Sequence, residues 1–202
     1  DFFAGKWNTI LRNRRSGGTL RFANLAFHQW IRESIVANKP YDKFVREIIT
    51  ASGSVASHPP VAWYQQVTDT NQRIEDAAQL FLGQRIQCAR CHHHPYEKWS
   101  QADYAQLSAF FTNVSKKNGR DPLEPAVFAR LGGASARHPK TGQALQPAGL
   151  DADEVAIGAH DDPRSHFADW MTSPDNPFFA KALANRYWKH FFGRGLVEPE
   201  DN

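Results

Sequence analysis

The chain has 202 residues, of which 41% are hydrophobic and 22% charged, with a formal net charge of +3. This balance predicts a folded globular protein and argues against a disordered chain, which would carry fewer apolar residues. The one short basic cluster lies at residues 12–15, so nucleic acid is not an expected partner. No apolar run approaches the roughly 20 residues of a membrane-spanning helix, and no signal-peptide pattern opens the chain.

Two helices are predicted in the N-terminal quarter of the chain. In residues 22–36 the apolar side chains that share one side of a helix are Phe22, Leu25, Ala26, Trp30 and Ile31. Pro40 is expected to open the second helix, because proline is favoured at helix starts, where its φ is already fixed near the helical value. The apolar stripe that follows it consists of Phe44, Val45, Ile48 and Ile49. We expect both stripes to face a core.

Three further helices are predicted along the chain. The first, 71–83, ends at Gly83 and carries the helically spaced residues Ile74, Ala77, Ala78, Phe81 and Leu82. Ser100 and Asp103 have the spacing of a capping box, and the apolar positions that follow are Tyr104, Leu107, Phe111 and Val114. A last helix begins at Asn176-Pro177, ends at Gly193 and contains Phe179, Leu183, Tyr187 and His190.

Residues 51–60 and 115–162 are predicted to be loops. Gly, Pro, Ser and Asp interrupt every periodic run in these two stretches. A short β-hairpin around Lys140-Thr141-Gly142, flanked by residues 127–131 and 143–145, is the one regular element that the second stretch allows.

The strongest chemical signal is the chain's only pair of cysteines. Cys88 and Cys91 are separated by two residues, and His92 follows immediately. On a helical turn residues i and i+3 share a face, so thiols at this spacing reach two vinyl groups on one porphyrin edge, and the next imidazole is placed at the iron. The motif predicts one covalently attached haem c, with His92 as the proximal iron ligand.

Three other chemistries use closely spaced cysteines and stay open beside this one. A thioredoxin-type redox pair usually starts a helix that follows a strand, whereas the segment before Cys88 is predicted to be helical. Zinc could bind both thiols and two of His92, His93 and His94, although three adjacent imidazoles fit a tetrahedral site poorly. A disulfide across two intervening residues closes too small a loop to stabilise 202 residues much.

Residues 79–111, QLFLGQRIQCARCHHHPYEKWSQADYAQLSAFF, resemble the planctomycetal cytochrome-c-like family. In that family CxxCHxHP(F/Y)(D/E) is followed by a tryptophan and an aromatic-rich helix. The likeness extends upstream to residues 38–53, NKPYDKFVREIITASG, and downstream to residues 175–202, which resemble the opening of the family's usual companion domain. One departure is His93, where the family commonly has Asn or Asp.

The resemblance implies haem c, an extracytoplasmic location, periplasmic or secreted, and a chain that is a piece of a longer protein. The family's biochemical role is largely unassigned. Together with the helical periodicity, the resemblance predicts a mostly α protein: an irregular helical c-type haem domain with long loops and room for one small β-hairpin. The predicted parts are a cytochrome-c-like haem-binding domain at 1–120, a loop-rich connection at 121–162, and at 163–202 the helical start of the companion domain packing on the first.

A second axial ligand is expected if the iron only passes electrons, because such iron is normally six-coordinate. The leading candidate is His190, which lies among aromatic residues and matches a histidine of the family's NRxWxHxFGRG run. A hydrogen-bonded core histidine is the competing interpretation. Met171, the only methionine, is more readily interpreted as a buried core residue. His94 is too close to His92 in sequence to reach the opposite face of the same porphyrin.

Other predicted haem contacts surround the motif. Trp99 and Phe111 are expected to wall the haem, with ordinary core packing as the alternative. Arg85 and Arg90 could pair with the propionates, since a guanidinium matches a carboxylate in bidentate geometry, or could simply be solvated.

The functional prediction is a monohaem c-type cytochrome that transfers single electrons outside the cytoplasm to a protein partner that the sequence does not identify. An electron carrier is favoured over a haem-dependent oxidoreductase. Two alternatives stay open. One is a haem enzyme with an open axial position for peroxide or another small ligand. The other is a haem-stabilised module for interaction or self-assembly.

Overall fold

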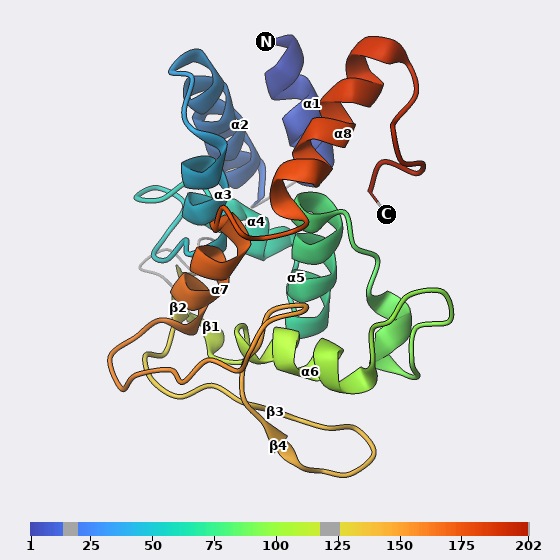
Figure 1. Ribbon diagram of the computed structural model, residues 1–202. Coiled ribbons are helices and arrows are strands. Elements are labelled where there is room, and N and C mark those ends of the chain that lie inside the picture. The colour runs from blue at the N-terminus through green and yellow to red at the C-terminus, as the bar shows by residue number, and fades with distance from the viewer. Residues whose placement is uncertain (14–19, 118–125, 202) are drawn as a thin grey trace. The chain divides into compact units, whose positions relative to one another are not determined.

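The computed structural model describes residues 1–13, 20–117 and 126–201, and these are mostly helical, with two short antiparallel sheets among them (Figure 1). The mostly α class predicted from the sequence is confirmed. Two compact units are present: unit 1 consists of Asp1–Thr68 and Val114–Arg130, and unit 2 of Asp69–Asn113 and Leu131–Asn202. Each unit combines segments distant in sequence, and the boundaries predicted at 120 and 162 stay a prediction. None of the described helices has the length and apolar character needed to cross a membrane.

The described part of unit 1 contains four helices and one sheet. The helices are α1 (Phe2–Ile10), α2 (Leu20–Val36), α3 (Tyr41–Ile49) and α4 (Val61–Gln66). Strand β1 (Val114–Lys117) pairs antiparallel with β2 (Ala126–Ala129). Aromatic rings fill the space between the first three helices: the centroid of Phe44 lies 4.9 Å from that of Trp30 and 5.5 Å from that of Trp7.

Helix α3 matches its prediction, whereas α2 presents a different face. Pro40 is the N-cap of α3, and all four residues of the predicted apolar stripe are buried. In α2 the predicted Phe22 and Leu25 are 59% and 60% exposed, and the buried positions are Ala23, Asn24, Phe27, Ile31 and Ser34. Two apolar stripes overlap on this helix. The buried stripe is the one that contains Ala23, Phe27 and Ile31.

Unit 2 holds the remaining elements, including the cysteine pair. They are α5 (Thr70–Ala77), the π-helix η1 (Ala78–Leu82), the 3₁₀ helix η2 (Gln87–Arg90), α6 (Gln101–Ala109), β3 (Ala136–Arg137), β4 (Ala144–Leu145), α7 (Pro163–Thr172) and α8 (Phe179–Phe192). Figure 1 shows α6 crossing the N-terminal half of α5, and α8 packs against η1.

The predicted helix at 71–83 is continuous but changes type. Asp69 caps its start by accepting a hydrogen bond from Gln72 N at 3.0 Å, and all five predicted apolar residues are buried. The last turn widens into the π-helix η1, and Gly83 ends it with a φ of +63°, a conformation that glycine adopts without strain. The chain then turns toward the cysteines.

The helix ends that position the site follow the sequence in part: α8 begins at Phe179, with Phe178 as its N-cap, and not at the predicted Asn176-Pro177. Helix α6 ends at Ala109, so Phe111 and Val114, which were predicted on it, lie beyond its end. The capping box is present: Asp103 N donates to Ser100 Oγ at 3.2 Å, and Ser100 N donates to Asp103 Oδ2 at 2.7 Å. Asn176 Oδ1 accepts from the main-chain N–H of Phe178 and Phe179, and α8 ends at Gly193 with a φ of +77°.

The predicted hairpin around residues 140–142 is formed by β3 and β4, with Ala136 opposite Leu145. Its expected upstream flank, 127–131, was wrong. Residues 126–129 instead form β2, where Val127 is fully buried and also bridges Gly53.

Candidate functional site

The two cysteines lie on a single tight turn at the surface of unit 2. Cys88 is within η2 and Cys91 is its C-cap, and both are exposed free thiols. The carbonyl oxygen of Cys88 accepts from Cys91 N at 3.2 Å and from His92 N at 3.3 Å. Side chains three residues apart eclipse each other in a 3₁₀ turn, so this turn places the two cysteines on one side. Ile86 and Ala89 are fully buried on the core side and anchor it.

His92 is exposed directly after the turn, and one of its ring nitrogens is engaged. Its Nδ1 lies 2.7 Å from the carbonyl oxygen of His93. When Nδ1 carries the proton, it donates to that carbonyl and leaves the lone pair of Nε2 available. A histidine that binds a metal typically has its second nitrogen held in this way, because the bond fixes the tautomer and the ring orientation.

The loop that follows His92 is closed by hydrogen bonds. His94 N donates to Trp99 O at 2.8 Å, and His94 Nδ1 accepts from Glu97 N at 2.9 Å. Gln101, buried at the start of α6, donates from Nε2 to the carbonyl oxygen of Cys91 at 2.8 Å. These bonds tie the cysteine turn to α6. They also give His94 a structural role within the loop.

The two aromatic residues predicted to wall the haem lie in different surroundings. Trp99 is 4% exposed, donates from Nε1 to Gln84 Oε1 at 3.1 Å, and meets Phe178 edge-on at 5.9 Å between ring centroids. Phe111 is fully buried and packs edge-on against Phe167 of α7 at 5.3 Å. Trp99 therefore belongs to the motif's own loop and Phe111 to the core between α6 and α7. Their contact with haem stays a prediction.

The two arginines predicted to meet propionates also differ. Arg85 forms an ion pair with Asp201, so a carboxylate of this chain already engages its guanidinium. Arg90 is exposed and close enough to Tyr104 for its charge to favour the ionised phenol. Of the two, Arg90 is the better placed to bind an added anion.

Tyr104 and Glu75 are polar residues of this region that the sequence did not single out. The Tyr104 hydroxyl donates to Glu75 Oε1 at 2.8 Å and lies 3.1 Å from Asn71 Oδ1. Burial raises the pKa of Tyr104 far above 10.0, and the bond to Glu75 raises it further. Tyr104 was expected only as an apolar helix position, and no sequence signal pointed to its partner on α5.

The residues considered as second axial ligands lie on α7 and α8. Met171 is fully buried in α7, in agreement with its interpretation as core. His190 is half-buried in the last turn of α8, where its ring meets that of Phe191 at 4.8 Å between centroids. Figure 1 shows this end of α8 extending beyond η1. The axial role of His190 stays a prediction.

Two thiols and an adjacent imidazole fit the attachment of a haem c, and a zinc site would need further ligands. Among residues 1–13, 20–117 and 126–201, no three His, Cys, Asp or Glu side chains gather as a metal site. A zinc site needs three or four protein ligands, whereas a porphyrin supplies four nitrogens and its iron needs only one or two more. The cysteine turn also follows a helix, not the strand that precedes a thioredoxin-type pair.

Comparison with known proteins identifies two families of unknown function. Residues 1–116 match PSCyt2, described as a protein of unknown function (DUF1549), and residues 163–202 match PSD1, described as a protein of unknown function (DUF1553). No curated protein and no solved structure matches the chain. The first match spans more than half of the chain and includes Cys88, Cys91 and His92. The chain therefore belongs to the planctomycete PSCyt2 (DUF1549) family and carries its usual companion, PSD1, after it.

Proposed function

We propose that this chain binds one haem c covalently and transfers single electrons outside the cytoplasm. Cys88 and Cys91 hold the haem through thioether bonds, and His92 Nε2 is the proximal iron ligand. One observation carries the proposal: two exposed, free thiols on a single anchored turn are followed by an imidazole whose Nδ1 is already engaged.

When bound, the haem supplies an iron that cycles between ferric and ferrous states. The protein's contribution is positional. Buried Ile86 and Ala89 anchor the turn, the carbonyl of His93 orients His92, and Gln101 holds the carbonyl of Cys91. A site held at each of these points changes little in geometry between oxidation states. The exposure of the motif also allows a partner protein to approach closely.

The proposed location follows from the chemistry of attachment. Covalent haem c is assembled outside the bacterial cytoplasm, so the chain would be periplasmic or secreted. Both thiols are consumed by the haem, which accords with the lack of any further cysteine for disulfides in an oxidising compartment. The partner is a redox protein, with no nucleic acid involved.

The test is expression alongside a haem c maturation pathway, followed by a pyridine haemochrome spectrum and an intact mass. We expect one haem per chain that acid–acetone extraction does not remove. The Cys88→Ala/Cys91→Ala variant should lose the haem, whereas His93→Asn should keep it, because the bond to His92 Nδ1 comes from the main-chain carbonyl of residue 93. A colourless protein with the mass of its polypeptide would end the proposal.

The exposure of all three motif residues also favours a second candidate, a haem enzyme with an open axial position. Spectroscopy separates the two functions. A low-spin oxidised spectrum that is indifferent to cyanide supports electron transfer, and a high-spin spectrum that shifts with cyanide or peroxide supports the enzyme. If His190 is the second ligand, His190→Ala converts the low-spin spectrum to a high-spin one.

A third candidate, an interaction or self-assembly module, is favoured by apolar side chains at the end of α8. The exposed residues are Trp188, Phe191, Phe192, Leu196 and Val197. Exposed apolar surface of this kind commonly marks association sites. Sedimentation over a range of concentrations would show self-association as a rise in mass. Phe191→Ser should then abolish that rise.

A further inference from the structure

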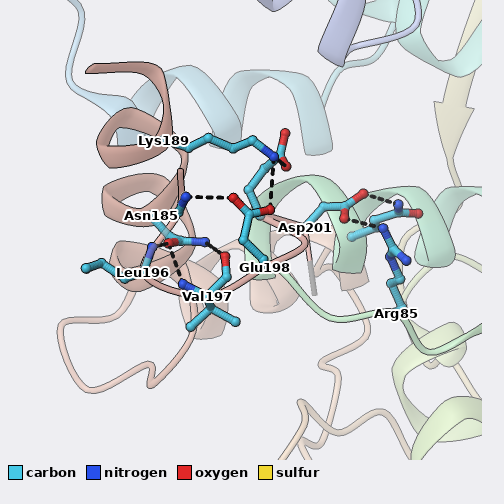
Figure 2. A network of polar contacts seen from close by, with 10 residues as sticks. Arg85, Asn185, Lys189, Leu196, Val197, Glu198 and Asp201 are labelled. Carbon is cyan, nitrogen blue, oxygen red and sulfur yellow. Dashed lines mark hydrogen bonds and ion pairs between the residues drawn. The ribbon is translucent and has the colours of Figure 1, made fainter. Parts of the chain in front are cut away.

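The segment that follows α8 is held against it by one amide side chain, as Figure 2 shows. Asn185 Oδ1 accepts from Leu196 N at 2.7 Å and from Val197 N at 3.0 Å, and its Nδ2 donates to Val197 O at 2.8 Å. Asn185 is 8% exposed, so these bonds are largely shielded from water. A single residue of α8 thereby fixes the path of the chain after Gly195.

Charged groups extend this attachment along the segment. Lys189 of α8 pairs with Glu198 at 3.0 Å and also with Glu200. Glu198 in addition accepts from Gly195 N at 2.7 Å. Together with Asn185, these contacts determine where the next residue, Asp201, is placed.

Asp201 joins the end of this segment to the residues that lead into the cysteine motif. Its Oδ2 accepts from Gln79 Nε2 at 2.5 Å, and its Oδ1 pairs with Arg85 (Figure 2). Gln79 Oε1 in turn accepts from Gln87 Nε2 at 3.2 Å, and Gln87 immediately precedes Cys88. One carboxylate is thus bonded to residue 85 and, through Gln79, to residue 87.

The fixed position of Asp201 distinguishes it from an ordinary surface ion pair. A lone exposed pair contributes little, because two long side chains must be ordered to form it. Here Asn185 and Lys189 already order the segment, and the Asp201 side chain is only 25% exposed. Less freedom is therefore lost when Asp201 meets Arg85 and Gln79.

We propose that Asp201 is a positioning residue for the haem motif, through which the PSD1 part of the chain controls the haem carried by the PSCyt2 part. This inference rests on the proposed function. Asp201 holds the approach to Cys88 from residue 85 to residue 87, and it neutralises the Arg85 charge there. Without that carboxylate, an unpaired positive charge would lie three residues before Cys88. Positive charge favours ferrous iron over ferric iron, so the reduction potential would rise.

The test compares two variants of the full haem-loaded chain that each remove one negative charge from the same segment. Asp201→Asn should raise the reduction potential and speed amide hydrogen exchange in a peptide spanning residues 84–92. Glu200→Gln removes one partner of Lys189 but leaves that lysine paired with Glu198 and leaves the carboxylate of Asp201 in place, so it should change the exchange in that peptide and the potential less than Asp201→Asn does. Adding Arg85→Gln to Asp201→Asn should bring the potential back toward its original value, because the unpaired charge is gone.

The inference is overturned if Asp201→Asn leaves both the potential and the exchange rates unchanged, or if Glu200→Gln shifts the potential equally. The haemochrome spectrum keeps this result separate from that of the proposed function. A chain without haem refutes the proposed function. Faster exchange at residues 84–92 in the Asp201→Asn variant of that chain would still establish that Asp201 holds this segment in place. If exchange at residues 84–92 is unchanged in the Asp201→Asn variant of the haem-free chain, the positioning role of Asp201 is refuted as well.

Discussion

The Tyr104 hydroxyl donates a hydrogen bond of 2.8 Å to the Glu75 carboxylate and so links α6 to α5. Tyr104 is 6% exposed, and the Asn71 amide oxygen lies 3.1 Å from the same hydroxyl. Arg90, one residue before Cys91, acts on this pair electrostatically. The contact therefore stabilises the two helices next to the cysteine turn.

Removing the hydroxyl of Tyr104 should destabilise the protein. Tyr104→Phe deletes the donor to a charged acceptor, which we expect to cost about 2 kcal/mol of unfolding free energy. Urea denaturation of the two proteins measures the difference. The matched control is Tyr96→Phe, because Tyr96 is 92% exposed and its replacement should change little. Equal stabilities for Tyr104→Phe and the unmodified chain would show that the bond contributes nothing.

The same tyrosine predicts how stability depends on alkaline pH. Burial, and then the bond to Glu75, raise the pKa of Tyr104 above its ordinary value of 10.0. The unfolded chain releases this proton near pH 10 while the folded chain keeps it, so stability is full below pH 10 and falls as the pH rises beyond it. Phenolate absorbance of the folded protein minus that of Tyr104→Phe should show no titration near pH 10. A step at that pH would contradict the raised pKa.

A buried arginine near the start of α7 makes a second stability prediction. Arg164 is fully buried and donates to both carboxylate oxygens of Asp162, which also caps the helix through Arg164 N. Asp162→Ala removes a charge partner of a buried guanidinium, and we expect a loss of about 3 kcal/mol. The adjacent Asp161 is exposed, and its carboxylate bonds to His166 and to Gly158 N at the surface, so Asp161→Ala should cost clearly less thermal stability. Similar effects of the two substitutions would argue against the buried pair.

Adjacent histidines in the loop after the motif should behave differently when replaced by alanine. His94 Nδ1 accepts the main-chain N–H of Glu97 at 2.9 Å, whereas His93 contributes its main-chain carbonyl to His92. His94→Ala should therefore speed hydrogen exchange at residues 95–98 and cost about 1 kcal/mol. His93→Ala should leave exchange in this loop as it was. Identical exchange in the two variants would refute the role given to His94.

Local features of the structure were predictable from the sequence. The capping box of Ser100 and Asp103, the buried stripe of α3 and the glycine that ends α8 all depend on residues within a few positions of one another. The cysteine turn belongs to the same class, since a spacing of three residues determines which side of a turn both thiols occupy. For these features, backbone geometry and periodicity are sufficient.

Features that depend on distant parts of the chain were not predictable in the same way. The face that α2 buries depends on its neighbours in unit 1, and the predicted face was wrong at Phe22 and Leu25. Asp201 meets Arg85 and Gln79 across more than a hundred residues, and a single carboxylate near the chain end carries no periodic signal. The bond between Tyr104 and Glu75 similarly requires the arrangement of two helices.

The pKa values of the acidic residues after α8 predict how the attachment of residues 195–201 to α8 responds to low pH. The main-chain N–H of Gly195 and the ammonium of Lys189 lower the pKa of Glu198 below its ordinary 4.5, and Lys189 does the same for Glu200. Burial alone would raise the pKa of Asp201, but the bonds from Gln79 and Arg85 outweigh it and bring the pKa below 3.8. Because each pKa is lower in the folded chain, the stabilisation is complete above about pH 4.5 and is lost as the pH falls through the folded values.

Hydrogen exchange at residues 195–201, measured from pH 6 downward with rates corrected for intrinsic chemistry, should accelerate as the pH falls below about 4.5. Lys189→Met should move the onset to higher pH, because it removes the cation that lowers two of the three pKa values. An onset that does not move in this variant would show that Lys189 does not hold the segment.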